Sequence, residues 1–93
     1  MDKLNEPEIE RALRDLPGWQ RSGDSITRTF TLPGFPDAIV FAAAAGNLAQ
    51  RADHHPDILI QYQKVTLTLS THSAGGLTAK DFALAKEVNA IAR

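Results

Sequence analysis

Hydrophobic side chains near the start of the chain recur with the period of an α-helix. Four of them fall at positions i, i+3, i+4 and i+7 of one helical face: Ile9, Ala12, Leu13 and Leu16. Asn5 or Glu6 precedes Pro7 at the beginning of this segment, and a Pro-Gly pair ends it. The pattern predicts a short amphipathic helix that buries one side.

Two later segments alternate between apolar and polar residues with the period of a β-strand. In residues 26–32, apolar side chains share the even positions and threonines occupy odd ones, and a strand-like segment at 19–21 precedes them across a Ser-Gly-Asp-Ser turn. In residues 65–71, Val or Leu at odd positions alternates with Thr or Ser, and the apolar segment 58–62 comes before. The pattern predicts two β-hairpins, each with a core face and a polar face.

Two more helices are predicted from the positions of proline, alanine and capping residues. Pro36 lies near the first turn of a predicted helix that continues to about residue 52. Its segment 42–46 consists of alanines and a glycine, which favours close packing against another helix, from this chain or from a second copy. Thr78 and Asp81 resemble a capping box that begins a final amphipathic helix.

The order α-β-β-α-β-β-α predicts an α+β fold. We expect a two-layer sandwich in which four antiparallel strands form one sheet and three helices cover one of its faces. A length of 93 residues, with no repeat or linker, predicts a single domain over residues 1–93. The polar face or an edge of the sheet is then the expected place for a ligand or partner.

Composition narrows the classes of function. Ten Lys and Arg residues against eleven Asp and Glu residues give a net charge of −1, which disfavours nucleic acid and anionic membranes as partners. The longest apolar stretch, residues 38–45, is far shorter than the ~20 residues of a membrane span, and the N-terminus lacks a secretory pattern. The absence of cysteine excludes disulfides and thiolate chemistry and favours a cytoplasmic location.

Three histidines are the candidate chemical groups. His54 and His55 follow the long predicted helix, and His72 follows the last strand; the antiparallel hairpin brings these two places to one end of the sheet. Imidazole titrates near pH 6.5, so a pair can donate and accept protons near neutrality. Solvated loop residues are the alternative interpretation. A three-histidine metal site is disfavoured, because adjacent side chains in extended backbone point to opposite sides.

Several motifs together resemble the signature of the pterin-4a-carbinolamine dehydratases. They extend from about Gly18-Trp19 to the last helix and comprise His54-His55-Pro56, Tyr62-x-x-Val65, Leu69-Ser70-Thr71-His72, Gly76-Leu77-Thr78 and Asp81. The resemblance implies the fold expected above, with dimers formed through sheet edges and tetramers formed through helices. It also implies removal of water from 4a-hydroxytetrahydrobiopterin to give quinonoid dihydropterin, in tetrahydrobiopterin recycling, without a metal or bound cofactor and in functional connection with an aromatic amino acid hydroxylase.

The resemblance also implies roles for individual residues. His54 and His72 are the general acid and base candidates, and His55 binds and orients the pterin. The remaining candidates for substrate binding are Trp19, Pro56, Thr71 and Asp81. One residue departs from the family pattern: Gln50 occupies the position, four before the first histidine, where the family commonly has an acidic side chain.

A second class of function fits the same scaffold. Some proteins that resemble the dehydratases act as partners or assembly factors of other proteins, and the small-residue helix would then be the operative surface. The histidines distinguish the two hypotheses, because a pure scaffold has no need of three imidazoles at one end of a sheet. The sequence therefore favours the enzyme and keeps the non-catalytic binding protein as the alternative.

Overall fold

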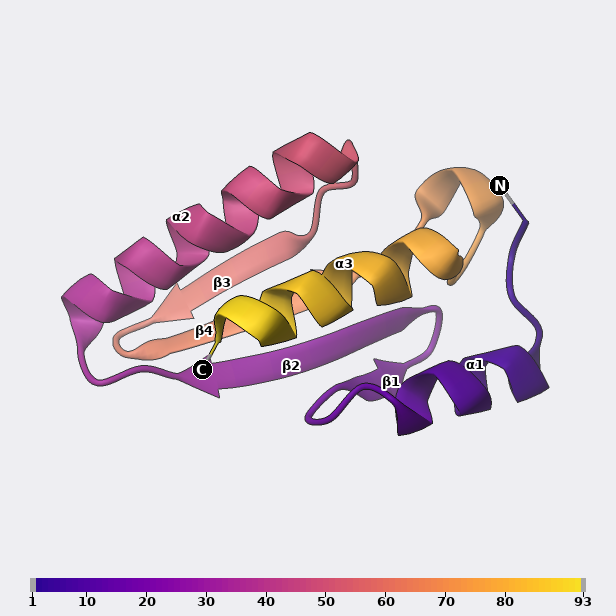
Figure 1. Cartoon of the computed structure of the whole chain (residues 1–93), viewed down its shortest axis with the longest axis horizontal. Coiled ribbons are helices and arrows are strands. Elements are labelled where there is room, and N and C mark those ends of the chain that lie inside the picture. The colour runs from indigo at the N-terminus through magenta and orange to yellow at the C-terminus, as the bar shows by residue number, and fades with distance from the viewer. Residues whose placement is uncertain (1, 93) are drawn as a thin grey trace.

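The structure is a computed structural model that describes residues 2–92. Its elements follow the predicted order α-β-β-α-β-β-α, with a short 3₁₀ turn added after the last strand (Figure 1). The elements are α1 (Glu6–Arg14), β1 (Gln20–Ser22), β2 (Ser25–Thr31), α2 (Phe35–Ala52), β3 (Asp57–Gln61), β4 (Lys64–Leu69), η1 (His72–Ala74) and α3 (Ala79–Ile91). The predicted fold class and element order are confirmed.

One antiparallel sheet carries all four strands, in the spatial order β1-β2-β4-β3. The helices cover one of its faces, against which the apolar residues of β4 are almost completely buried (Figure 1). The other face carries threonines whose hydroxyls pair across β2 and β4, at 2.8 Å between Thr29 and Thr66 and 3.2 Å between Thr27 and Thr68. The predicted division into a core face and a polar face is confirmed, and none of the helices in residues 2–92 covers the polar face.

The small residues of α2 let that helix lie close to its neighbours. Ala38, Ala42, Ala45 and Ala49 recur at helical spacing and are buried against the rest of the core. The helix that packs against them is α3 of the same chain. The opposite side of α2 remains exposed and includes the large apolar side chains Ile39 and Val40. Within residues 2–92, none of the helices combines the length and the apolar content needed to cross a bilayer.

The segment after α1 is held in place by hydrogen bonds to side chains of β2 and α3. Trp19 Nε1 donates to Asn89 Oδ1 at 2.8 Å, and Arg28 Nη1 donates to the same oxygen at 2.7 Å and to the Pro17 carbonyl at 3.0 Å. The α1 helix is also tied to β1, where the Arg21 guanidinium hydrogen-bonds the Glu6 carboxylate and lowers the pKa of Glu6. These contacts hold α1 against the β1 edge of the sheet.

Gly18 gives the first test of this packing. Its φ of +86° is left-handed, and a Cβ there would lie 2.5 Å from the Arg28 Nε atom. We expect Gly18→Ala to lower the free energy of unfolding by more than the ~1–2 kcal/mol of the left-handed backbone alone, because Arg28 is held by Asn89 and Pro17. Gly23→Ala is the matched control: its φ is +60°, yet no atom beyond the adjacent residues lies within 4 Å of the added Cβ. Equal losses in urea unfolding would contradict the prediction.

Candidate active site

A left-handed residue turns the chain from α2 into the predicted site. Asp53 ends α2 with φ 51° and ψ 44°, and the His54 amide donates to the Ala49 carbonyl at 3.1 Å. The chain then enters β3, whose first residue, Asp57, pairs with Thr68 of β4. This pairing brings residues 54–57 beside the end of β4 and the η1 turn that follows it.

Two of the three histidines line one cavity of about 210 Å³ at this end of the sheet. His55 comes from the α2–β3 connection and His72 from η1. The other lining residues are Ser25, Asp57, Thr68 and Ser70. Every lining side chain is polar, and the volume lies below the ~300–1,000 Å³ of pockets for drug-sized ligands. The cavity therefore suits a small polar molecule.

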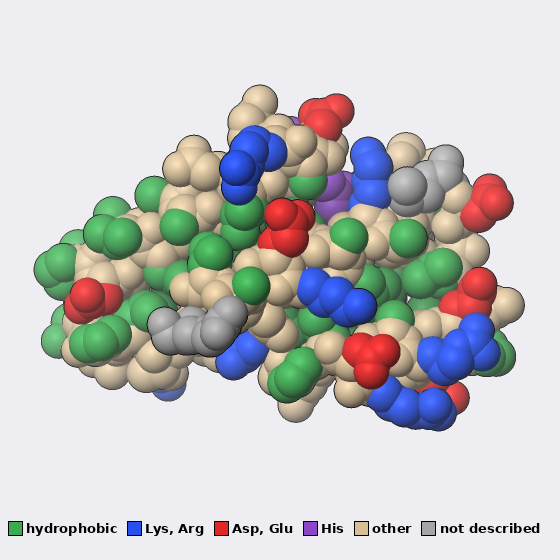
Figure 2. All heavy atoms as spheres, viewed as in Figure 1, with side chains coloured by type: hydrophobic (Ala, Val, Ile, Leu, Met, Phe, Trp, Pro, Cys, Tyr) green, Lys and Arg blue, Asp and Glu red, His purple; other side chains and the backbone are tan. Residues whose placement is uncertain are grey.

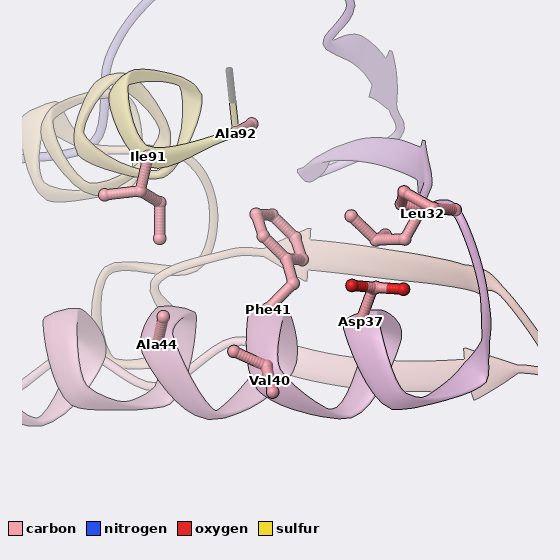
Figure 3. Close-up of a pocket in the computed structure, with 8 residues that line it drawn as sticks. Leu32, Asp37, Val40, Phe41, Ala44, Ile91 and Ala92 are labelled. Carbon is pink, nitrogen blue, oxygen red and sulfur yellow. The ribbon is translucent and has the colours of Figure 1, made fainter.

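Two larger hollows lie elsewhere and contain no histidine. One of about 390 Å³ lies between α2, the end of α3 and the segment after β2, where Val40, Phe41 and Ile91 contribute to its wall (Figure 3). The other, of about 420 Å³, lies between α1 and α3 and includes Phe82. Size alone would select these sites, but the candidate acid and base groups are in the smaller cavity.

His54 is in a different environment from the other two histidines. Only 9% of the residue is exposed, and its Nε2 atom lies 2.5 Å from Asp81 Oδ1. Because a carboxylate only accepts hydrogen bonds, the ring nitrogen donates. His54 is absent from the cavity wall, whereas His55, the next residue, is part of it. The two neighbours thus point in different directions, as adjacent residues in extended backbone do.

Asp81 is the centre of a fully buried hydrogen-bond network. Its Oδ2 atom accepts from the Thr71 hydroxyl at 2.8 Å and from the Thr78 amide at 2.9 Å, which completes the predicted capping box of α3. The hydroxyls of Thr71 and Thr78 are 2.9 Å apart, and since Thr71 donates to Asp81, Thr78 donates to Thr71. No buried side-chain nitrogen or oxygen among the described residues lacks a partner.

This network fixes the two residues that precede the cavity histidines. Asp81 binds His54, the neighbour of His55, and Thr71, the neighbour of His72. Thr71 also closes the η1 loop through two backbone hydrogen bonds with Gly76, at 3.0 and 3.3 Å. One buried carboxylate therefore holds both chain segments from which the cavity imidazoles project.

Gln50 contacts the second histidine directly. Its Oε1 atom lies 3.0 Å from His55 Nε2, so the ring N–H donates to the amide oxygen. A neutral His55 ring in this arrangement carries its lone pair on Nδ1. The residue that departs from the family pattern thus still orients the imidazole, with a neutral amide as the partner.

The other residues proposed from the sequence lie outside the cavity wall. Trp19, a substrate-binding candidate by resemblance, lies in the core: it is 5% exposed, its indole N–H donates to Asn89, and its ring packs edge-on against Phe30. Thr71 and Asp81 are buried beneath the site, and Pro56 is half-buried in the connection before β3. The side chains of these residues are absent from the cavity wall.

Four lining residues were not predicted from the sequence: Ser25, Asp57, Thr68 and Ser70. Thr68 and Ser70 share the strand parity of His72, and Asp57 is two residues after His55, so alternation carried a signal for three of them. Ser25 belongs to β2 and reaches the cavity only through the pairing of β2 with β4. Within residues 2–92, no three His, Asp or Glu side chains converge closely enough to hold a metal ion.

The fold is a small α+β domain, and its polar cavity brings together two imidazoles, groups that can both donate and accept hydrogen bonds. Two imidazoles share a polar cavity, and a buried network holds the segments that carry them. A family model described as pterin 4 alpha carbinolamine dehydratase matches residues 2–91. The chain belongs to this family, and it is an enzyme of the lyase class.

Curated relatives support the same family over almost their whole length. A Roseiflexus castenholzii protein named "Putative pterin-4-alpha-carbinolamine dehydratase" is 57% identical over 95% of this chain and 95% of its own. A Nocardia farcinica protein of the same name is 51% identical over 97% of this chain and 95% of its own.

Solved structures confirm the fold. A Brucella melitensis protein described as a transcriptional coactivator/pterin dehydratase superposes with a TM-score of 0.94 at 41% identity, covering 99% of this chain and all of its own. A pterin dehydratase-like protein described as a RuBisCO assembly factor in the alpha-carboxysome has a TM-score of 0.65 at 23% identity, covering 80% of this chain and 86% of its own. The second likeness shows the fold alone.

Proposed function

We propose that the protein removes water from 4a-hydroxytetrahydrobiopterin and releases quinonoid dihydropterin. The observation that carries this proposal is the placement of His55 and His72 on the wall of one small polar cavity. Family membership supports a pterin carbinolamine as the substrate class.

The proposed reaction needs one proton donor and one proton acceptor. The C4a–O bond breaks, and the leaving hydroxyl takes a proton from one imidazolium to become water. The electron pair of the N5–H bond forms the C4a=N5 double bond, and the N5 proton passes to the other, neutral imidazole. Proton exchange with solvent then restores both rings. General acid–base catalysis of this kind contributes ~10²–10⁴-fold to a rate.

The geometry supports different roles for the three histidines from those that the resemblance implies. We assign the acid and base roles to His55 and His72, because both line the cavity. His54 becomes a positioning residue, since its ring donates to Asp81 and only 9% of the residue is exposed. In this proposal Asp81 and Thr71 also support the site from beneath, and Pro56 directs the chain from His55 into β3.

Self-association and a supplying enzyme complete the proposal. We propose a cytoplasmic homo-oligomer, a dimer or tetramer, whose substrate comes from an aromatic amino acid hydroxylase. Exposed apolar side chains support association: Phe35, Ile39 and Val40 on α2, and Ile58 and Leu59 on the edge strand β3. Figure 2 shows hydrophobic side chains gathered at the end of the molecule where α2 begins.

Stopped-flow dehydration tests the proposed function. The substrate 4a-hydroxytetrahydrobiopterin is generated in place by a hydroxylase, and its loss is followed with and without the wild-type protein at pH 7. We expect acceleration well above the uncatalysed rate. The matched control is His55→Ala/His72→Ala, which removes both cavity imidazoles and leaves the Asp81 network intact; it is expected to lose the acceleration.

A folded wild-type protein without acceleration would overturn the enzymatic proposal. It would favour the alternative, a non-catalytic binding or assembly protein on the same scaffold. The observation behind that alternative is the exposed apolar surface of α2, together with the coactivator description of the Brucella relative.

A further inference from the structure

One lining residue of the cavity, Asp57, carries a carboxylate. Asp57 begins β3 and is exposed, and its carboxylate has no hydrogen-bond or ion-pair partner among residues 2–92. The other five lining residues are histidines or hydroxyl residues, which both donate and accept hydrogen bonds. An ionised carboxylate accepts only, so Asp57 is the one group in the wall that selects for donors on the ligand.

The position of Asp57 along the strand separates it from the catalytic end. Asp57 pairs with Thr68 of β4, whereas His72 lies beyond the end of that strand. His55 is two residues before Asp57, which is a spacing of ~6.6 Å along an extended strand. Thr68 is itself bound to Thr27 through their hydroxyls. The cavity thus has imidazoles at one end and a carboxylate farther along the sheet.

The proposed substrate has a matching arrangement of groups. In the pyrimidine ring of a pterin, C4a and C2 occupy opposite positions, so the leaving hydroxyl and the 2-amino group lie on opposite sides of the ring. The 2-amino group and the neighbouring N3–H present two parallel donors, to which a carboxylate can bind in the two-pronged manner it uses with guanidinium.

We propose that Asp57 binds the 2-amino and N3–H groups of the pterin and thereby selects 2-aminopteridines over analogues that lack the amino group. This inference rests on the proposed function and extends it from the reacting atoms to the recognition of the ring. Binding at this edge directs C4a and N5 toward His55 and His72. Asp57 is then a specificity-determining residue for the reaction.

A cycle of two protein forms and two ligands tests the assignment. The ligands are 6-methylpterin and its 2-deamino analogue, and their dissociation constants are measured by titration calorimetry with wild type and with Asp57→Asn. Charge-assisted hydrogen bonds predict that Asp57→Asn weakens 6-methylpterin binding by roughly 10- to 100-fold. The same substitution is expected to change binding of the 2-deamino analogue much less. Glu10→Gln, which removes the same charge from the exposed side of α1, is the control and should bind both ligands like wild type.

The possible outcomes separate this inference from the proposed function. If wild type dehydrates the carbinolamine but Asp57→Asn binds both ligands unchanged, or loses both equally, the role of Asp57 is overturned while the dehydratase proposal stands. If wild type neither accelerates dehydration nor binds 6-methylpterin, both fail. Urea unfolding of Asp57→Asn, expected to match wild type, establishes that weaker binding does not reflect a damaged fold.

Discussion

His72→Ala is expected to lower kcat for dehydration by ~10²–10⁴-fold, the contribution of one positioned acid or base. The fold should tolerate the change, because His72 is exposed on a 3₁₀ turn and Thr71, not the imidazole, is held by the Asp81 network. Stopped-flow rates at saturating substrate and urea unfolding of the same preparation measure the two effects. A variant with wild-type kcat would remove His72 from the mechanism.

Two substitutions at His54, to glutamine and to alanine, distinguish a catalytic role of this residue from a positioning role. Glutamine can place an amide N–H near the position of Nε2 and so donate to Asp81, whereas alanine cannot. If His54 only positions the site, His54→Gln retains most of the turnover and the stability that His54→Ala loses. Equal loss of kcat in both variants, with His54→Gln fully stable, would instead make His54 an acid or base.

Asp81→Ala is expected to be the most destabilising single change, with a loss of roughly 3–5 kcal/mol in the free energy of unfolding. The substitution removes the acceptor for His54, for the Thr71 hydroxyl and for the Thr78 amide, all of which are buried. Each then remains unsatisfied in the interior, which costs about 1–3 kcal/mol per group. Chemical denaturation with urea measures the loss.

A pair at Thr71 keeps this prediction testable even if Asp81→Ala does not fold. Thr71→Ser retains the hydroxyl that donates to Asp81, and Thr71→Val removes it at similar volume. We expect Thr71→Val to lose about 1–3 kcal/mol and Thr71→Ser clearly less. Since Thr71 precedes His72, Thr71→Val should also lower kcat. A valine variant as stable and as active as the serine variant would show that the network does not hold the site.

Local patterns in the sequence determined most of the fold. Alternation in 65–71 predicted a strand with one buried face; the observed strand ends at Leu69, and its Val and Leu residues are almost completely buried. The capping box of Thr78 and Asp81 predicted the start of α3. The antiparallel connection between β3 and β4 required residues 54–55 and His72 to lie at one end of the sheet. Such features follow from hydrogen bonds and periodicities within a few residues of one another.

Only the tertiary structure decided which of these residues face the cavity. His54 and His55 are identical side chains in adjacent positions that follow the left-handed Asp53. His54 points inward to the buried Asp81, whereas His55 lines the cavity. Trp19 was assigned to the pocket by resemblance, but its indole N–H is satisfied by Asn89, a residue of α3 far away in the chain. Ser25 reaches the site through the β2–β4 pairing alone. The sequence by itself thus determines which chemical groups are present and how far apart they lie along the chain. The direction in which each side chain points depends on the distant residue that hydrogen-bonds each buried polar atom.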